Sequence, residues 1–260
     1  MRRSPPPPCS GPETALTDRF QFETVETVDS TNRLARLRVE QGAEDGYALR
    51  AVTQTGGVGR EGRVWESPAG NLYASFVMRP ARPLRDFPQL SFVCALAVRS
   101  VVAEAVGPDV AIGLKWPNDV LAEGRKLSGV LIETAGDPVA AILGIGINIA
   151  CSPAQSRWPA THLGALTAAP PSPEALGINL GRALDHWARI WDQEGFPPIR
   201  DAWMASAIGI GGPMLLRTAQ EETEGRFMDL EMDGTLLMAL PNGALRRVAA
   251  GDVTPLVAAG

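Results

Sequence analysis

Two lysines stand close together in the sequence, and each borders a tight turn. Lys115 ends an apolar, strand-like run and is followed by Trp116-Pro117-Asn118-Asp119, while Lys126 opens the next strand-like run. A lysine picked at random is expected at the surface, with its alkyl stem on apolar neighbours and its ammonium group in water. Inside apolar strands a lysine is costly unless an anion meets it. The pair therefore predicts a site for a negatively charged ligand.

A glycine-rich loop from Gly56 to Gly62 adds further cations. Gly57-Val58-Gly59-Arg60-Glu61-Gly62 matches the Gly-x-Gly-x-x-Gly pattern of dinucleotide-binding folds, but the helix and the acidic residue that this pattern needs do not follow. The simplest alternative is a flexible hairpin loop. Glycines, however, let a ligand approach the backbone, and arginines bind anions. With Arg60, Arg63 and Trp65 in or beside it, the segment favours an anion-binding loop that closes over a ligand.

Other kinds of chemistry find no support in the sequence. No HExxH or P-loop pattern occurs, and His162 and His186 have no suitably spaced Ser, Cys or carboxylate partner. The three cysteines lack metal-type spacing, which fits a reducing cytoplasm better than a disulfide framework. A formal net charge of −5 argues against binding nucleic acid. No stretch is predicted to span a membrane or to act as a signal peptide.

The lysines and the loop must be positioned by a sheet. Alternating and β-branched residues predict strands over 20–28, 47–53, 72–78, 112–116, 127–134 and 140–149. Helical periodicity is present around Leu34, Leu37 and Val39 and over 90–106, 178–191 and 199–208. The loop thus joins strand to strand, and 111–150 is typical of an antiparallel meander. We predict an α+β fold with a mixed or antiparallel sheet and packed helices.

The end of the chain has a different pattern. Short alternating segments at 214–217, 227–232, 235–240 and 245–248 are separated by Asp233-Gly234 and Asn242-Gly243 turns, which predicts a small β-barrel. Three regions follow from this pass along the chain: a disordered Pro-rich tail over 1–19, a catalytic domain over 20–208 and the barrel over 209–260.

Taken in order, these motifs resemble those of biotin protein ligases. The resemblance runs from about Val28 to Ile149 and rests on Asp29-Ser30-Thr31-Asn32, Gln54 with the loop to Arg63, Trp65, Ser67-Pro68-x-Gly70-Asn71-Leu72-Tyr73, Lys115-Trp116-Pro117-Asn118-Asp119, Lys126-Leu127-x-Gly129-x-Leu131-x-Glu133 and Gly144-x-Gly146-x-Asn148. By local sequence alone, the first motif is an ordinary helix N-cap and the last a strand with close backbone packing. Gly225-Arg226-Phe227 and Ala250-Gly251-Asp252-Val253 also resemble the SH3-like barrel that ends these enzymes.

The resemblance implies a fold related to class II synthetases and lipoate ligases. It also implies an activity: ATP-dependent conversion of biotin to biotinyl-5′-AMP, then transfer to a lysine of a biotin carboxyl carrier protein. ATP and biotin would be substrates, with Mg²⁺ arriving on ATP. The implied catalytic residues are Lys126, Lys115 and Arg60. Those implied for biotin are Ser30, Thr31, Asn32, Gln54, Gly57, Val58, Gly59, Arg60 and Lys126. Those implied for the nucleotide are Arg60, Arg63, Trp65, Lys115, Asn118, Lys126, Gly146 and Asn148.

Two departures from the family pattern matter. Val58 stands where the family loop commonly has an arginine, which predicts weaker retention of the adenylate. The Pro-rich start cannot form the helix-turn-helix that some members carry, so no operator binding is expected.

Two other functions stay open at this point. A lipoate or octanoate ligase would use similar chemistry, but the polar series of Ser30 to Asn32 with Gln54 favours biotin. A non-catalytic biotin-binding regulator would be expected to have lost Lys115, Lys126 or Arg60, and all three are present. A homodimer through an exposed sheet edge is a further expectation. The sequence names no metal ligand and no base for the acceptor lysine.

Overall fold

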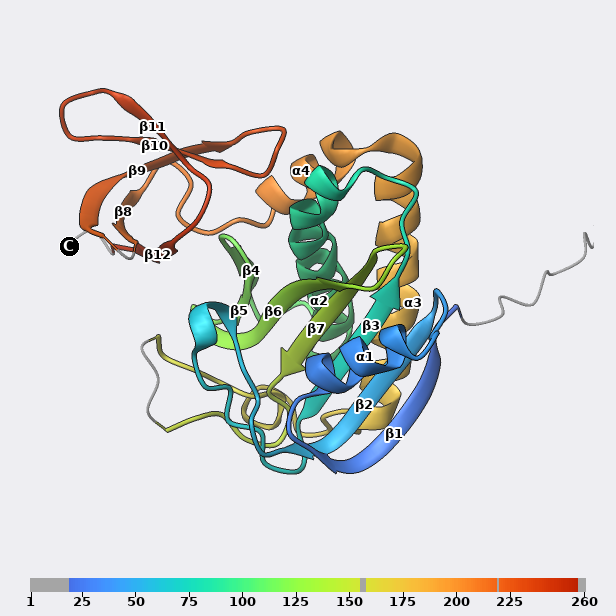
Figure 1. The fold of residues 1–260 in the computed structure, drawn as a ribbon. Helices are drawn as coiled ribbons and strands as arrows, with labels where there is room; N and C mark the ends of the chain where they lie inside the picture. The colour runs from blue at the N-terminus through green and yellow to red at the C-terminus, as the bar shows by residue number, and fades with distance from the viewer. Residues whose placement is uncertain (1–18, 155–157, 219, 257–260) are drawn as a thin grey trace, which may run out of the picture.

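The computed structural model describes residues 19–154, 158–218 and 220–256. In this part of the chain lie a seven-stranded sheet, a five-stranded sheet and four α-helices (Figure 1). The predicted α+β class is confirmed. The predicted disordered tail and Cys9 fall outside the described residues, apart from Arg19, which pairs with Asp45 at 2.9 Å.

The seven-stranded sheet has the order β1-β2-β3-β7-β6-β5-β4. Its strands are β1 Gln21–Val28, β2 Tyr47–Gln54, β3 Leu72–Met78, β4 Ile112–Lys115, β5 Asp119–Ala122, β6 Arg125–Ala135 and β7 Ala140–Ile147. Within this sheet only the β1 and β2 pair is parallel, so the sheet is mixed. The predicted antiparallel meander is confirmed as β4 to β7, although β5 was not predicted as a strand. Every residue of the interior strand β3 is buried, as expected for a strand covered on both faces.

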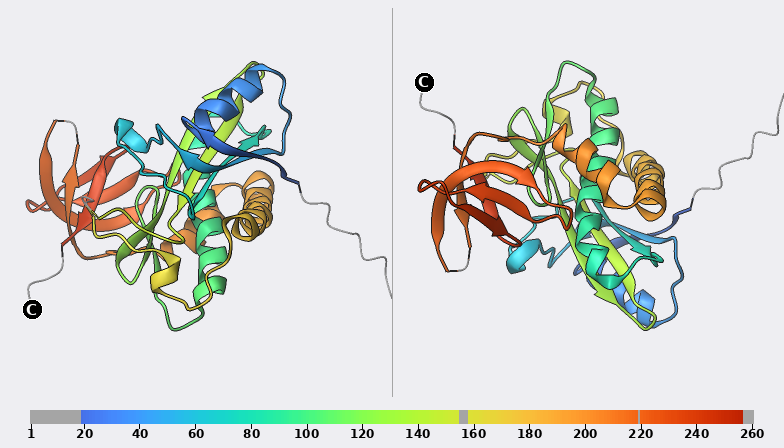
Figure 2. Two further views of the ribbon diagram at one scale, coloured as in Figure 1. Left: turned by 90° about the horizontal axis from the view of Figure 1, so that it is seen from below. Right: turned by 90° about the horizontal axis from the view of Figure 1, so that it is seen from above.

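Helices cover both faces of this sheet, as the two views of Figure 2 show. α1 (Thr31–Glu40) packs on β2, β3 and β7, and α2 (Leu90–Val106) and α3 (Pro173–Glu194) pack on the opposite face. α3 starts before the predicted 178, because Ser172 caps its N-terminus by accepting a hydrogen bond from the Ala175 amide. The longest apolar helical stretch, Leu84–Val106, meets the length and hydropathy of a membrane span, but 61% of its apolar window is buried inside the protein.

The prediction of a helix over 199–208 is wrong at both ends. α4 runs over Phe196–Met204, with two prolines in its first turn. It stops there because the next residues pair with the edge of the sheet: the Leu114 amide donates to Ser206 O at 2.8 Å, and the Ile208 amide donates to Leu114 O at 2.9 Å.

The C-terminal residues form the antiparallel five-stranded sheet. Its strands are β8 Pro213–Arg217, β9 Glu222–Leu230, β10 Leu236–Ala239, β11 Leu245–Val248 and β12 Asp252–Pro255, in the order β11-β10-β9-β8-β12. The sequence patterns predicted the first four and missed β12. Trp203 of α4 packs near Phe227 of β9, with ring centroids 6.5 Å apart, and one buried apolar cluster extends through both sheets. The boundary between residues 208 and 209 stays a prediction.

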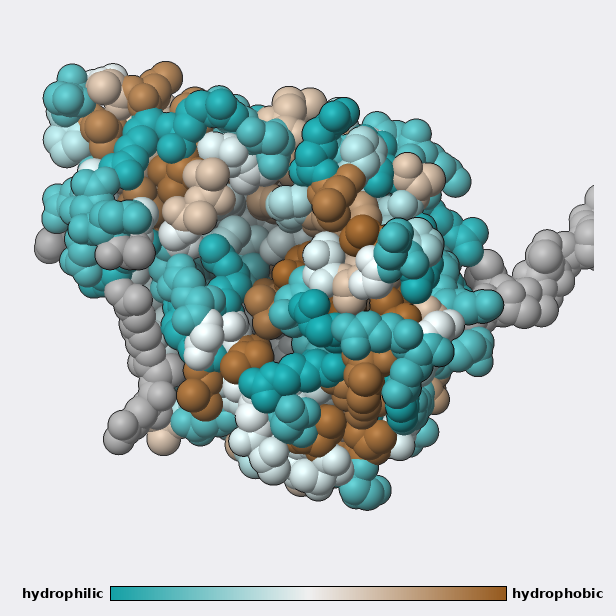
Figure 3. Space-filling model, in the orientation of Figure 1, coloured by the Kyte–Doolittle hydropathy of each residue, from teal (hydrophilic) through white to brown (hydrophobic). Residues whose placement is uncertain are grey.

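The face of the molecule in Figure 3 is mostly hydrophilic, and its apolar residues are scattered over several elements. This is ordinary for a folded protein, because polar side chains never cover a whole surface. A cavity is lined mainly by the seven-stranded sheet and its loops, with β12 of the five-stranded sheet at one side.

Candidate active site

A cavity of about 310 Å³ opens where β6, β7, the glycine-rich loop and β12 meet. Of the residues predicted from the resemblance, all but Gly57 line it. They come from α1, β2, the loop, β4, β6 and β7, so the fold brings together side chains that lie far apart in the sequence. Their individual roles stay predictions.

Polar side chains at the start of α1 make one end of the cavity. Ser30 is the N-cap residue, yet its side chain makes no capping hydrogen bond, so the ordinary capping role suggested by local sequence does not hold. The Oε1 atom of Gln54 accepts hydrogen bonds from the Thr31 amide at 2.8 Å and from Thr31 Oγ1 at 3.1 Å. These polar groups are therefore held facing the cavity.

Asn32 is fixed at both ends of its amide. Its Oδ1 accepts from Ser75 Oγ at 2.6 Å, and its Nδ2 donates to Glu133 Oε2 at 2.8 Å. Gly144 makes room for it, because a Cβ atom there would lie 2.3 Å from Asn32 Oδ1. Ser75 and Glu133 were not predicted to act at the site. Glu133 appeared only as the end of a motif.

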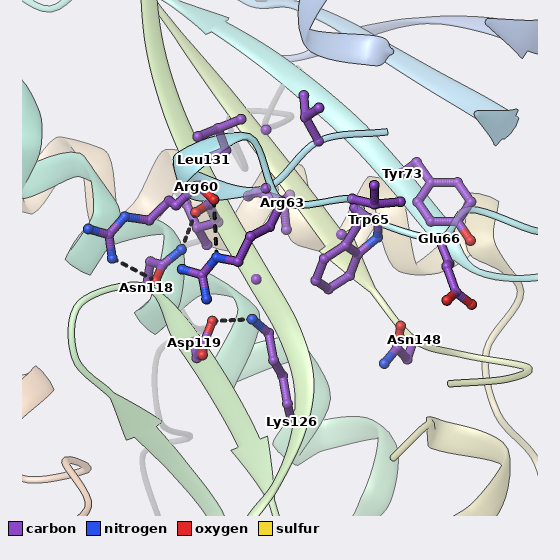
Figure 4. Close-up of a pocket in the computed structure, with 18 of the residues that line it drawn as sticks. Arg60, Arg63, Trp65, Glu66, Tyr73, Asn118, Asp119, Lys126, Leu131 and Asn148 are labelled. Atoms are coloured by element: carbon purple, nitrogen blue, oxygen red, sulfur yellow. Dashed lines mark hydrogen bonds and ion pairs between the residues drawn. The ribbon is translucent and has the colours of Figure 1, made fainter. Parts of the chain in front are cut away.

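Three charged groups meet at the other end, where β4 and β5 form a tight hairpin. Lys115 pairs directly with Asp119 in the strand register, and its Nζ lies 3.0 Å from Asp119 Oδ2. Lys126 Nζ lies 2.6 Å from Asp119 Oδ1, and Figure 4 marks this ion pair with a dashed line. Burial by itself raises the pKa of Asp119, but the two ammonium groups outweigh it and lower that pKa below its usual range. Asp119 is thus a carboxylate that holds both predicted cations in place.

Strand β12 brings a second carboxylate to the site. Asp252 Oδ1 lies 3.1 Å from Lys115 Nζ, and Asp252 Oδ2 lies 3.0 Å from Arg63 Nη1. Burial by itself raises the pKa of Asp252, but Lys115 and Arg63 together lower it by more, so the net shift of this pKa is downward. The side chain of Lys115 is only 3% exposed, which requires such partners. Neither aspartate was predicted to be a site residue, because Asp119 is typical of a turn and Asp252 lies in a strand too short to show alternation.

The glycine-rich loop is folded over the cavity. An antiparallel bridge between Val58 and Val64 closes its base. The Arg60 guanidinium donates to Asn118 Oδ1 at 3.4 Å and to the Gly251 carbonyl at 3.3 Å, and burial lowers its pKa. Through Arg60 the loop therefore contacts the residue just before β12 as well as the hairpin, and Arg63 contacts β12 itself. Val58, which replaces the family arginine, contributes a backbone bridge and no charge.

Trp65 lies on a pair of glycines at the floor of the cavity. Gly129 and Gly146 face each other across β6 and β7, and Cβ atoms there would lie 3.1 Å and 2.6 Å from the indole. The ammonium group of Lys126 lies 5.5 Å from the ring centroid, and the indole Nε1 is buried with no hydrogen-bond partner among the described residues. Gly146 lines the cavity as predicted, and the geometry gives its physical reason, since any side chain would displace Trp65.

Asn148 and Trp158 line the cavity beside these groups. The Asn148 side chain donates to the Thr161 carbonyl at 3.0 Å, which anchors the segment after β7. The ring of Trp158 lies 5.4 Å from Lys115 Nζ. Trp158 was not predicted, because a lone tryptophan near a proline carries no pattern.

Electrostatically, the cavity joins two unlike ends. One end offers amide and hydroxyl groups, and the other holds several cations around two carboxylates. Such a site suits a ligand with a neutral polar group at one end and an anionic group at the other. The cations can then stabilise the reaction of that anionic group with a second anion.

Comparison with known proteins agrees with this geometry. Residues 24–149 match the model of the Biotin/lipoate A/B protein ligase family. The chain is 36% identical over 223 residues to a biotin--[acetyl-CoA-carboxylase] ligase of Paracoccus denitrificans, covering 83% of this chain and 92% of that protein. It is 31% identical to the bifunctional ligase/repressor BirA of Bacillus subtilis, covering 88% of this chain and 72% of that one.

Solved structures give the same result. The biotin protein ligase from Aquifex aeolicus in complex with biotin and ATP superposes with a TM-score of 0.77 at 27% identity, covering 90% of this chain and 97% of that one. Sequence and fold thus agree over most of the chain, and the chain belongs to the family of biotin protein ligases.

Proposed function

We propose that this protein activates biotin with ATP to give biotinyl-5′-AMP and transfers the biotinyl group to a lysine of a biotin carboxyl carrier protein. The observation that carries the proposal is the cavity itself, which joins an amide-lined end to a cluster of cations. The Paracoccus denitrificans relative, named for acetyl-CoA carboxylase, and the Aquifex aeolicus complex with biotin and ATP support it.

The first step brings two anions together. An oxygen of the biotin carboxylate attacks the α-phosphorus of ATP, the bond to the β-phosphate oxygen breaks, and pyrophosphate leaves with that electron pair. The fixed positive charge that this step requires comes from Lys115, Lys126 and Arg60. Such charge is effective because the cations are already oriented before the reaction. Mg²⁺ enters as part of the ATP substrate.

In the second step the amine of the acceptor lysine attacks the acyl carbon of the adenylate. An amide bond forms, AMP leaves, and the amine gives up its proton. The Arg60 loop folded over the cavity excludes water meanwhile, which protects the mixed anhydride from hydrolysis.

At the other end of the cavity, the ureido ring of biotin offers one carbonyl acceptor and two N–H donors. Thr31 and Gln54 are oriented polar groups of the kind that such a ring needs. Lipoate and octanoate have no ureido group and would leave these polar groups unpaired. This is the structural reason for preferring biotin.

The test is pyrophosphate release by the purified protein with MgATP and, in parallel, biotin, lipoate, octanoate or no acid. Release with biotin alone is the expected result. Release only with lipoate or octanoate would overturn the assignment of biotin, and no release with any acid would overturn adenylation itself.

Three finer expectations belong to the same proposal. The enzyme acts in the cytoplasm, it binds neither nucleic acid nor a membrane, and it forms a homodimer. The net charge of −5 supports the absence of nucleic-acid binding. The free edge of the described seven-stranded sheet at β1 supports association through a sheet edge (Figure 1). Sedimentation velocity over a range of concentrations tests the dimer, and a single monomeric species at all of them would contradict it.

A further inference from the structure

Ser67 sits just behind the cavity, at the point where the glycine-rich loop ends. It is 8% exposed and is not among the residues that line the cavity. Its Oγ lies 2.9 Å from Gln54 Nε2 and 2.9 Å from the Trp65 carbonyl oxygen. A carbonyl only accepts, so the hydroxyl donates to Trp65 and accepts from Gln54. One hydroxyl therefore joins the proposed biotin end to Trp65, which the family resemblance implies for the nucleotide and which we expect to stack on adenine.

The other end of the Gln54 amide fixes which way it points. Its Oε1 accepts from the Thr31 amide, so turning the group over would set two donors against each other. With Oε1 on Thr31 and one N–H on Ser67, the second N–H of Nε2 stays available to a ligand in the cavity that Gln54 lines. A ureido carbonyl is an acceptor of the right kind.

The incoming arm of the loop rests on the same junction. A Cβ atom at Gly57 would lie 2.5 Å from the Trp65 carbonyl oxygen, 2.7 Å from Ser67 Oγ and 2.9 Å from Gln54 Nε2. In return, the Trp65 amide donates to the Gly57 carbonyl at 2.9 Å. Gly57 was expected to contact biotin, but it lies outside the cavity lining and packs on this hydroxyl. Both arms of the loop and Gln54 thus meet at Ser67.

We propose that Ser67 is a positioning residue that couples the biotin end of the site to the nucleotide end. Its hydroxyl orients the Gln54 amide for the acid substrate and holds the backbone that carries Trp65 for the nucleotide. Binding of either substrate therefore stabilises the geometry that the other needs. This inference rests on the proposed function for its ligands, but the junction itself is present without them.

The matched pair of variants is Ser67→Ala and Ser128→Ala. Ser128 is also a buried serine, but in the part of the chain that the structure describes its hydroxyl has no hydrogen-bond partner, so its removal controls for the loss of a buried hydroxyl alone. Hydrogen exchange of the ligand-free proteins comes first, because it needs no turnover. Ser67→Ala is expected to speed exchange of the Trp65 amide about tenfold, and Ser128→Ala to leave it unchanged.

Calorimetric titrations with biotin, alone and with a non-hydrolysable ATP analogue, then measure the coupling. Ser67→Ala should weaken biotin binding about tenfold and reduce the enhancement of biotin binding by the nucleotide. If Ser67 acts through Gln54, the double variant Gln54→Ala with Ser67→Ala should bind biotin no more weakly than Gln54→Ala alone. Ser67→Thr keeps a hydroxyl and should recover most of the enhancement.

The outcomes separate this inference from the proposed function. Wild-type protein that binds no biotin would contradict the function, while the exchange rates of the two serine variants would still decide the positioning role. Equal exchange rates and equal biotin affinities in Ser67→Ala and Ser128→Ala would overturn the inference. Additive losses with Gln54→Ala would overturn it as well.

Discussion

Replacement of Lys126 by alanine removes the cation that the structure places between Asp119 and Trp65. A unit charge about 4 Å from an anion is worth about 4 kcal/mol at the effective dielectric of a partly buried site. The Lys126 side chain is 26% exposed, so solvent screening reduces this interaction energy to about 3 kcal/mol. The released Asp119 carboxylate also repels the incoming anions.

We therefore expect the kcat/KM for biotin-dependent pyrophosphate release to fall about a hundredfold in Lys126→Ala. Folding should survive, because Asp119 keeps Lys115 at 3.0 Å. Arg125→Ala is the matched control, since Arg125 is the exposed cation one position earlier on β6 and does not line the cavity. The reasoning would be refuted by a folded Lys126→Ala enzyme within about threefold of wild type, or by an equal loss in Arg125→Ala.

Three further results are expected. Arg60→Gly should open the loop, since the contacts to Asn118 and Gly251 are lost, and released adenylate should then label lysines of a bystander protein, detected by avidin blot; labelling restricted to the carrier would contradict the closing role. Trp65→Ala should raise the nucleotide dissociation constant about tenfold and that of biotin much less, because we expect the indole to stack on adenine; equal losses of nucleotide and biotin affinity in calorimetry would count against this stacking. Asp119→Asn should be about 3 kcal/mol less stable at neutral pH, because the buried Lys115 ammonium loses one of its two carboxylate partners and Lys126 loses the carboxylate beside it. Lys115 and Lys126 hold the folded pKa of Asp119 below the ordinary aspartate value of 3.8, so its stabilisation is present above that pH and is lost as pH falls through the folded pKa. Urea unfolding of wild type and variant should therefore converge below about pH 4; a constant difference down to pH about 2 would contradict the assignment.

The sheet and the longer helices could be predicted because their side chains follow the periods that packing requires. The helix over Leu90–Val106 and the strand over Leu72–Met78 have the predicted bounds. α1 shows where such reasoning fails. Leu37 fits the apolar period but is 45% exposed, whereas Thr31 and Asn32 are buried because they face the cavity.

The cations of the site were predicted from their residue types, but the carboxylates that pair with them were not predicted. The cations stand out in the sequence, since lysine in an apolar strand is unusual. Asp252 gives no such signal, because its role depends on β12 reaching across to Lys115 and Arg63, a contact between distant parts of the chain. Ser67 was noted as part of a family motif, but no role was predicted for it, since a serine before a proline is typical of any loop.

The measurement that tests the account most directly is transfer of labelled biotin to a biotin carboxyl carrier protein by the purified enzyme with MgATP. The account predicts one biotinyl group on the acceptor lysine, found by mass spectrometry, and none on a carrier whose acceptor lysine is replaced by arginine. An unlabelled carrier, although the enzyme is folded and supplied with both substrates, would contradict it.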